Sequence, residues 1–390
     1  MSEEYNELMN KYKDYIDLTD AIYRLKTLDE DKINEIYKNI KSQFIEKGIM
    51  TALQTFKMID TAMKYNNRYF KSYFLLLQML SKEYHLNKDK LLNWYQGKYK
   101  KINIESKNSL LGAIMNDDIT KFVILAEKDD FDIDQEVICS IYPLCCMTLL
   151  ELCSYYGSVN CFKFLLTNFK SKILKHCTPC AFLGANPDII SKCLEDRVGD
   201  YDMMEFAIAS HNIDFVSYMM NECGIEFKLI ESGRFNNLHA FLVYYDQTKD
   251  INGCMAASSL FNIPSLCEYF ISKGADINAN YYSFTALHLA AEEDCSKAAE
   301  FLISKGISME LICQSAYTPL DVAAKNNSVE TMRVLLLHGA NVNSRTDFDY
   351  GRTALHYAAS HHNQEAFDIL VSFGADLNVR DGFGKLPHMY

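Results

Sequence analysis

The sequence Thr285-Ala-Leu-His-Leu-Ala-Ala has two further copies in the C-terminal third of the chain, Thr318-Pro-Leu-Asp-Val-Ala-Ala and Thr353-Ala-Leu-His-Tyr-Ala-Ala. The three copies begin 33 and 35 residues apart. Each is followed by a second apolar run that closes on a glycine, which is Gly306, Gly339 or Gly374 in turn. A fixed period of this length indicates a repeat architecture rather than a single globular domain.

The residue types in each copy suit a helical unit. The threonine at each start is a good helix N-cap, because its hydroxyl accepts a hydrogen bond from an unpaired backbone N–H. Pro319 falls in the first turn, where a missing N–H is no loss. The paired alanines let neighbouring helices approach closely. The phased glycines suit a left-handed residue that ends the second helix.

On these motifs the C-terminal region resembles the ankyrin repeat. The resemblance implies a helix–turn–helix unit followed by a β-hairpin, and a surface that binds proteins. The runs that begin at Gly274, Gly339 and Gly374 would lead into the hairpins, with Asn and Asp side chains bonded to the local backbone. His288 and His356 match the histidine of the family signature, which implies a hydrogen bond from the imidazole to the neighbouring unit.

Weaker copies extend upstream, with starts near Ser109, Thr148, Thr178 and Ala207. A stretch from Phe235 resembles a segment found beside ankyrin arrays in large families of unicellular eukaryotes, to which no function is assigned. We therefore predict an all-α fold: an ankyrin-repeat solenoid of eight or nine helix–turn–helix units with β-hairpin loops, preceded by a small helical bundle. The expected domains are residues 1–104 (helical, unknown function), 105–250 (degenerate repeats) and 251–390 (regular repeats).

Residues 1–104 contain no repeat, but their apolar residues fall at helical spacing in several runs. Gly48 and the segment Tyr65-Asn-Asn are the expected breaks between helices. Several helices packed as a bundle would cover the first repeat of the array, whose open face exposes apolar surface.

The charge is unevenly distributed. Residues 1–100 hold 17 basic and 14 acidic residues, whereas the remainder holds 22 basic and 37 acidic residues. Because an acidic array repels phosphate backbones, nucleic acid is a poor candidate partner, and we expect a protein partner with a basic surface. There is no secretory signal at the start and no stretch long enough to insert into a membrane, so we expect an intracellular protein, in the cytoplasm or the nucleus.

The thirteen cysteines are expected to be free thiols. Cys177-Thr-Pro-Cys180 has the spacing of half a zinc site, but the repeat places Cys180 where the signature has a buried leucine. Gly382-Phe-Gly-Lys lies in the hairpin phase and is not a phosphate loop. With no convergent nucleophile, base and orienting group, we expect no enzymatic activity, no cofactor and no metal.

Candidate partner-binding residues lie at the hairpin tips and at the turns after the first helices of the regular units. Exposed aromatic side chains on projecting loops often anchor protein interfaces. The acidic cluster Glu292-Glu293-Asp294 is expected to be solvated, with contact to a basic partner as the alternative. The candidates are Tyr281, Tyr282, Phe284, Glu292, Glu293, Tyr317, Lys325, Asn326, Phe348, Asp349, Tyr350, Arg352 and His361.

Three alternatives stay open. The chain could be a substrate-receptor adaptor of a ubiquitin-ligase-type assembly, or an enzyme with an unrecognised site. A further unit begins at Asp381 and is not completed, which leaves no polar cap in the sequence. Either the chain is therefore shortened, or a partner or a second copy of the chain covers the last repeat.

Overall fold

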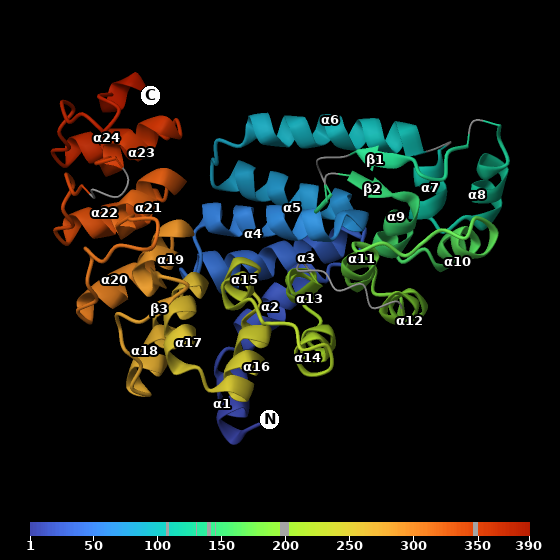
Figure 1. Cartoon of the computed structure of the whole chain (residues 1–390), viewed down its shortest axis with the longest axis horizontal. Coiled ribbons are helices and arrows are strands. Elements are labelled where there is room, and N and C mark those ends of the chain that lie inside the picture. Colours follow the sequence, from blue (N-terminus) through green and yellow to red (C-terminus); the bar gives the residue numbers. More distant parts are fainter. Residues whose placement is uncertain (107–108, 130, 139–141, 145, 196–202, 346–349) are drawn as a thin grey trace. The chain divides into compact units, whose positions relative to one another are not determined.

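The computed structural model describes residues 1–106, 109–129, 131–138, 142–144, 146–195, 203–345 and 350–390, with backbone only at 99–106 (Figure 1). These residues are mostly helical, which confirms the all-α prediction. Their strands form two short antiparallel pairs, β1 (Glu136–Ile138) with β2 (Cys146–Thr148) and β3 (Asn280–Tyr281) with β4 (Phe284–Thr285). No helix in these ranges is long and apolar enough to cross a membrane.

The chain forms two compact units. The first, called here the array unit, comprises residues 1–6 and 241–390, and the second, the bundle unit, comprises residues 7–240. The array unit is therefore built from two segments that are distant in sequence. The domain boundaries expected at residues 104 and 250 stay predictions.

The N-terminal part of the chain is helical, with breaks at Gly48 and after Tyr65 as expected. Gly48 has a left-handed φ of 62°, which a glycine adopts without strain. The elements here are α1 (Glu3–Lys11), α2 (Lys13–Tyr23), α3 (Glu30–Ile40), η1 (Lys41–Ile45), α4 (Ala52–Tyr65), η2 (Asn67–Tyr69), α5 (Phe70–Glu83) and α6 (Asp89–Ser106).

Nine successive helix pairs follow in the described residues, in agreement with the eight or nine units predicted. They begin with α7 (Leu110–Met115) and α8 (Ile119–Ala126), α9 (Leu149–Tyr156) and α10 (Val159–Asn168), α11 (Cys177–Gly184) and α12 (Pro187–Glu195), α13 (Met203–Ala209) and α14 (Ile213–Asn221), and α15 (Leu229–Arg234) and α16 (Leu238–Thr248). The remaining pairs are α17 (Ile251–Ser258) and α18 (Pro264–Ser272), α19 (Ala286–Glu292) and α20 (Ser296–Ser304), α21 (Pro319–Asn326) and α22 (Val329–Leu337), and α23 (Ala354–Ser360) and α24 (Gln364–Ser372). The 3-10 turns η3 (Ser259–Phe261) and η5 (Pro387–Met389) complete the elements named here.

First helices pack against one another from α7 to α15 and from α17 to α23, and second helices do so from α8 to α12 and from α18 to α24. In the array unit the inner row is α17, α19, α21 and α23, and the outer row is α18, α20, α22 and α24. Ala290, Ala323 and Ala358 in the inner row are completely buried. Their small size allows this close stacking.

The signature residues act as predicted. Thr285, Thr318 and Thr353 each form a capping box with the residue three positions later, and Pro319 opens α21. The three phased glycines have left-handed φ values of 89°, 92° and 87°. The buried imidazole of His288 bonds Thr285 through Nδ1 and the backbone oxygen of Tyr317 in the next unit through Nε2, at 2.8 and 2.9 Å.

The hairpins are less regular than the resemblance implies. Within the described residues of the array unit, only the connection between α18 and α19 contains paired strands. The next connection has a backbone hydrogen bond across the turn, which Cys313 N–H donates to the Tyr317 oxygen at 3.0 Å. After Gly374 the chain turns back, and η5 packs against α23, where the Lys385 oxygen lies 3.3 Å from His356 Nε2.

The N-terminal helices contact not only α7, the first helix of the degenerate repeats, but also later helices of these repeats. In the bundle unit, α6 packs against α7, as the expected cap would. In addition, the Tyr65 hydroxyl donates to Glu205 of α13 at 2.8 Å, and the Tyr155 hydroxyl of α9 accepts from Asn67 N–H at 2.7 Å. His211, after α13, bonds Asp20 of α2 at 2.6 Å. Parts of the inner row of the degenerate units are therefore covered by the chain itself.

Candidate partner-binding surface

A line of exposed apolar side chains runs along the hairpin tips of the array unit. Tyr282, Tyr350 and Phe383 occupy the same place, three residues before the N-cap residue of α19, α23 and η5, and are 63%, 57% and 58% exposed. The intervening hairpin has Ser315 at that place, and its exposed apolar residues are Leu311 and Ile312, at 37% and 47%. We call the five apolar residues the tip strip.

The backbone at two of these tips turns in a way that projects the side chains. Tyr282 and Ser283 have φ values of 49° and 70°, and Tyr350 and Gly351 have values of 52° and 60°. Two successive left-handed residues are typical of the tight type I′ hairpin turn. A left-handed tyrosine costs about 1–2 kcal/mol relative to an ordinary backbone conformation. Since both tyrosines are mostly exposed, core packing does not account for their presence.

The last two tips form one cluster. The rings of Tyr350 and Phe383 lie 4.4 Å apart, and the Gly382 N–H donates to the Tyr350 oxygen at 2.6 Å. A Cβ at Gly382 would lie 3.1–3.2 Å from Tyr350 atoms, so a glycine permits this approach. The Arg352 guanidinium lies over Phe383 at 5.8 Å and over Tyr390 at 5.2 Å, and it donates to the Tyr390 hydroxyl at 2.9 Å.

A second group of aromatic and basic side chains belongs to the inner helices. Tyr317 lies at the start of α21, and its ring meets the ring of Tyr357 in α23 edge-on at 5.1 Å. The ammonium group of Lys325 lies 5.0 Å from the Tyr317 ring centroid. Tyr317 and Lys325 are both half-buried, so they are held in place but still reach the surface. The structure thus brings these two candidates together.

The remaining candidates do not join the tips. Glu292, Asn326 and His361 lie at the C-terminal ends of inner helices, about 10 Å along the axis from the hairpins that precede those helices. Glu292 and Glu293 are half-buried, and Asp294 is buried. The prediction that this acidic cluster is solvated is therefore wrong for Asp294.

Two hairpin residues of the first unit also belong to the candidates. Tyr281 packs its ring edge-on against Tyr282 at 4.6 Å, and Phe284 lies 6.0 Å from the ring of His288. Both are half-buried and support the tip rather than form it. Phe348 and Asp349 lie outside the described residues.

The charge around the last tip is basic among the described residues. Arg345 donates to the Gly351 oxygen and to the Arg380 oxygen, at 2.9 and 3.0 Å. The Lys385 ammonium lies 4.6 Å from the Tyr390 ring centroid. Asp381 is buried and pairs with Arg352 at 3.7 Å. A partner with a basic surface, which stays a prediction, would have to bind elsewhere on the array.

Sequence reasoning missed Leu311, Ile312, Tyr357 and Phe383. The signal for Phe383 was present, because Gly382-Phe-Gly lies in the hairpin phase one unit after Tyr350. Leu311 and Ile312 follow Gly306 in that same phase. Tyr357 replaces the second leucine of the signature, a substitution that does not by itself indicate a surface.

The cysteine-rich repeat is a packed core. Cys177 and Cys180 on α11 are completely buried in a hydrophobic cluster that also contains Cys153, Cys161 and Cys193. Burial raises the pKa of the Cys177 thiol to about 12. The prediction of a buried core cysteine at position 180 is confirmed. The described residues contain no group of His, Cys, Asp or Glu side chains arranged to hold a metal ion.

Comparison with sequence families identifies three segments. Residues 282–313 match the ankyrin repeat, and residues 308–381 match a run of three ankyrin repeats. Residues 169–244 match a domain of unknown function, DUF3447. This last match overlaps the segment that begins at Phe235 and extends it upstream through the degenerate units.

Curated relatives match parts of the chain. The B-cell lymphoma 3 protein homolog of Mus musculus is 40% identical over 80 residues, 20% of this chain and 17% of that protein. Delta-latroinsectotoxin-Lt1a of Latrodectus tredecimguttatus is 32% identical over 115 residues, 29% of this chain and 9% of the toxin. An ankyrin repeat protein of fowlpox virus is 28% identical over 160 residues, 40% of this chain and 42% of the viral protein. The chain thus covers less than half the length of each of these relatives.

Proposed function

Because residues 282–381 of this chain are ankyrin repeats, we propose that the array unit binds a partner protein along the tip strip and the adjoining face of the inner helices. The observation that carries the proposal is the recurrence of Tyr282, Tyr350 and Phe383 at one hairpin position, each more than half exposed. Large aromatic side chains give the most binding energy per residue when a partner buries them.

The periodic placement supports one extended interface rather than separate patches. Consecutive units present their tips in the same phase, and the aromatic rings of Tyr350 and Phe383 already touch across two units. Tyr317, Tyr357 and Lys325 extend the surface from the tips towards the inner helices. An extended segment or a loop of a partner that buries apolar side chains between these rings would fit this layout.

The degenerate repeats are a weaker candidate for the same role. In the bundle unit, Tyr65 stacks edge-on against Phe206 at 5.6 Å and against Phe235 at 4.9 Å. Tyr65 of α4 thus already occupies part of the face that a partner would use on these repeats. Partner binding is therefore assigned to the regular units.

The proposal is tested by affinity purification and mass spectrometry with the full chain, followed by quantitative binding of the partner so identified. The double variant Tyr350→Ala, Phe383→Ala should weaken binding by about tenfold or more, because each ring is a central contact. Its melting temperature should stay close to that of the wild type, since exposed side chains contribute little to folding.

Leu337→Ala is the matched control. Leu337 is 74% exposed as the last residue of the outer helix α22 and is not part of the tip strip, so its removal should leave binding unchanged. Equal binding by all three proteins would exclude the tip strip as the binding surface. A large loss of stability in the double variant would show that these rings are packed in the folded protein. The adaptor role in a ubiquitin-ligase-type assembly and the enzyme alternative stay hypotheses.

A further inference from the structure

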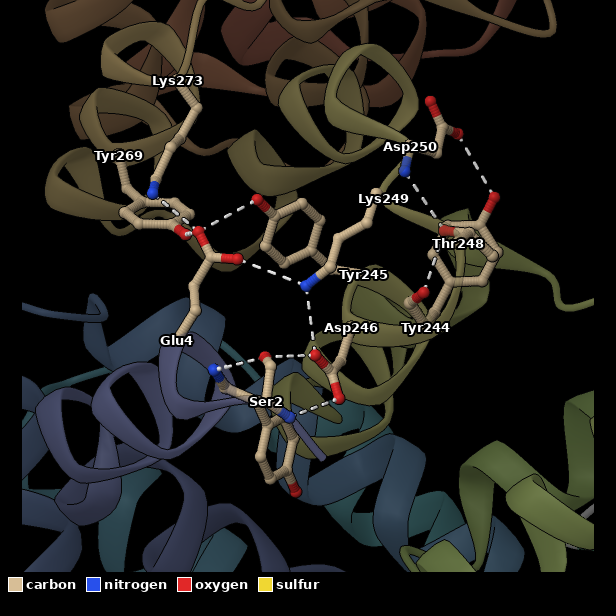
Figure 2. A network of polar contacts seen from close by, with 11 residues as sticks. Ser2, Glu4, Tyr244, Tyr245, Asp246, Thr248, Lys249, Asp250, Tyr269 and Lys273 are labelled. Atoms are coloured by element: carbon tan, nitrogen blue, oxygen red, sulfur yellow. Dashed lines mark hydrogen bonds and ion pairs between the residues drawn. The ribbon is translucent and has the colours of Figure 1, made fainter.

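Residues 1–6 are part of the array unit, where side chains of α16 and α18 hold them (Figure 2). The contacts are made by Ser2 and Glu4. Their partners are Tyr245, Asp246, Lys249, Tyr269 and Lys273, which we call the Glu4 site.

Glu4 is the most heavily bonded residue of this segment. Its carboxylate lies 2.7 Å from Lys273 Nζ and 3.2 Å from Lys249 Nζ, and it accepts hydrogen bonds from the hydroxyls of Tyr269 and, at 3.4 Å, Tyr245 (Figure 2). The hydrogen bonds from Lys273 and then Tyr269 lower the pKa of Glu4 to about 2. A carboxylate that meets two ammonium groups and two phenols is recognised as an anion, because all four neighbours are donors.

Ser2 provides a second, opposite contact. Its backbone N–H donates to Asp246 Oδ2 at 3.2 Å, and its hydroxyl donates to Asp246 Oδ1. The same hydroxyl oxygen accepts from Tyr5 N–H at 3.2 Å and so caps α1. Lys249 lies between the two contacts, at 3.1 Å from Asp246. The Glu4 site thus binds the N-terminal end of a helix that has a serine N-cap and a carboxylate two residues after it.

The next unit of the array lacks the full set of donors found in the Glu4 site. Lys273 lies over the Tyr269 ring at 5.3 Å, and the next unit repeats this pair with Lys305 over Phe301 at 5.2 Å. Phe301 lacks the hydroxyl that Tyr269 donates to Glu4. Lys305 lies 3.7 Å from Glu268 of α18, the outer helix of the preceding unit. The two units therefore share their packing and differ in the donors that a carboxylate needs.

We propose that the Glu4 site binds the N-terminal end of an acidic helix, and that residues 1–6 are its displaceable intramolecular ligand. The contacts are polar and partly hydrated, since the side chains of Lys249 and Lys273 are 48% and 43% exposed. A partner segment with the Ser-x-Glu pattern would compete for the same donors. Displacement would release the N-terminal end of α1, at which the chain leaves the array unit for the bundle unit.

The first test measures whether Glu4 holds the segment. In the full chain, Glu4→Gln should raise hydrogen exchange of the N-terminal amides by about tenfold or more, because the ionic bonds to both lysines are lost. Glu3→Gln is the matched control, since Glu3 is exposed, and it should leave exchange unchanged. Equal exchange in the wild type and in Glu4→Gln would overturn the proposal.

The second test asks whether the site accepts a ligand in trans. A fluorescent peptide of residues 1–12 should bind the full-length Glu4→Lys variant at least about tenfold more tightly than it binds the wild type, whose own segment competes at a high effective concentration. The same peptide with glutamine at position 4 should bind neither protein. Adding Lys273→Met to the Glu4→Lys variant should abolish binding, and adding Lys305→Met should not.

Two further results would overturn the proposal. One is equal peptide binding by the Lys273→Met and Lys305→Met proteins. The other is the absence of peptide binding to a Glu4→Lys protein whose N-terminal amides exchange freely. Tyr350→Ala, Phe383→Ala should not affect peptide binding, so failure here is distinguishable from failure of the proposed partner surface.

Discussion

Asp294 Oδ1 accepts a hydrogen bond of 2.9 Å from the backbone N–H of Thr331 in the next repeat. Asp294 has a left-handed φ of 59° in the turn between α19 and α20, and Thr331 lies in the first turn of α22. The turn of one unit therefore caps the outer helix of the unit that follows. Asn262 and Asn327 do the same, with bonds of 3.1 Å to Ala298 N–H and 3.3 Å to Ala366 N–H.

This relationship predicts that Asp294→Ala destabilises the array unit by about 1–2 kcal/mol, because a helix cap is lost and Thr331 N–H keeps no side-chain acceptor. Asp294→Asn should have little effect, since asparagine performs the same role at positions 262 and 327. Urea denaturation of the full chain, followed by circular dichroism, would measure the difference. Identical midpoints for the wild type and both variants would show that the bond contributes nothing.

The sequence predicted the parts of the fold that depend on neighbours within one period. Thr285 caps its own helix and His288 reaches the next unit through a bond that the repeat phase defines, so both roles could be assigned from the motif. The burial of Asp294 could not, because its partner is 37 residues away on a helix of another unit. The signature of one repeat contains no information about that contact.

The surface residues were harder to predict for a related reason. The hairpin phase predicted that Tyr282 and Tyr350 lie at loop tips, where both are exposed, but a tyrosine does not signal the left-handed φ of these turns. The Glu4 site was not predicted at all, because Lys273 lies far along the chain from Glu4, and lysine and glutamate are both common on protein surfaces. Long-range polar contacts of this kind depend on the packing of the whole unit.

A pH dependence follows from the buried histidines. Burial lowers the pKa of His288, and also of His356, against a partly opposing effect of backbone hydrogen bonds. The folded state therefore keeps both imidazoles neutral where the unfolded chain binds protons. Stability should be fully present above about pH 6.5 and fall as the pH drops below it, by at most about 1.4 kcal/mol per pH unit for each histidine.

His288→Gln separates this effect from other titrations. The variant is expected to be less stable than the wild type at pH 7.5. Between pH 7 and pH 5.5, however, its stability should fall by less than that of the wild type. The pKa of Glu4 and that of Asp381 are lowered below the usual carboxylate range, so these groups affect stability only at more acidic pH. Parallel stability curves for the two proteins would contradict a neutral buried His288.

The thiols should differ sharply in reactivity. Cys223 is exposed, whereas Cys153, Cys177 and Cys180 are completely buried, and burial raises the pKa of each of these three thiols. Iodoacetamide at pH 7.5 should therefore alkylate Cys223 first in the native protein and all four in urea. Site-resolved mass spectrometry would measure the order. Rapid native alkylation of Cys180 would show that the α11 core opens.

A buried polar link between the N-terminal helices and the degenerate repeats is the imidazole of His211. Its Nδ1 lies 2.6 Å from Asp20 Oδ1, its Nε2 lies 2.8 Å from the Phe235 oxygen, and its ring stacks on Tyr23 at 4.2 Å. The His211 side chain is completely buried, and Asp20 is 26% exposed.

His211→Ala should destabilise the bundle unit by about 1–3 kcal/mol, because the Asp20 carboxylate and the Phe235 oxygen lose their buried imidazole partner together. Hydrogen exchange should increase in α2 and stay unchanged in α19 to α24. Asp17→Ala is the control, since Asp17 forms an exposed pair with Lys13 on the same helix, and its effect should stay within about 0.5 kcal/mol. A double-mutant cycle with Asp20→Ala should give a coupling energy above about 0.5 kcal/mol, and additive effects would mean that the two side chains do not stabilise one another.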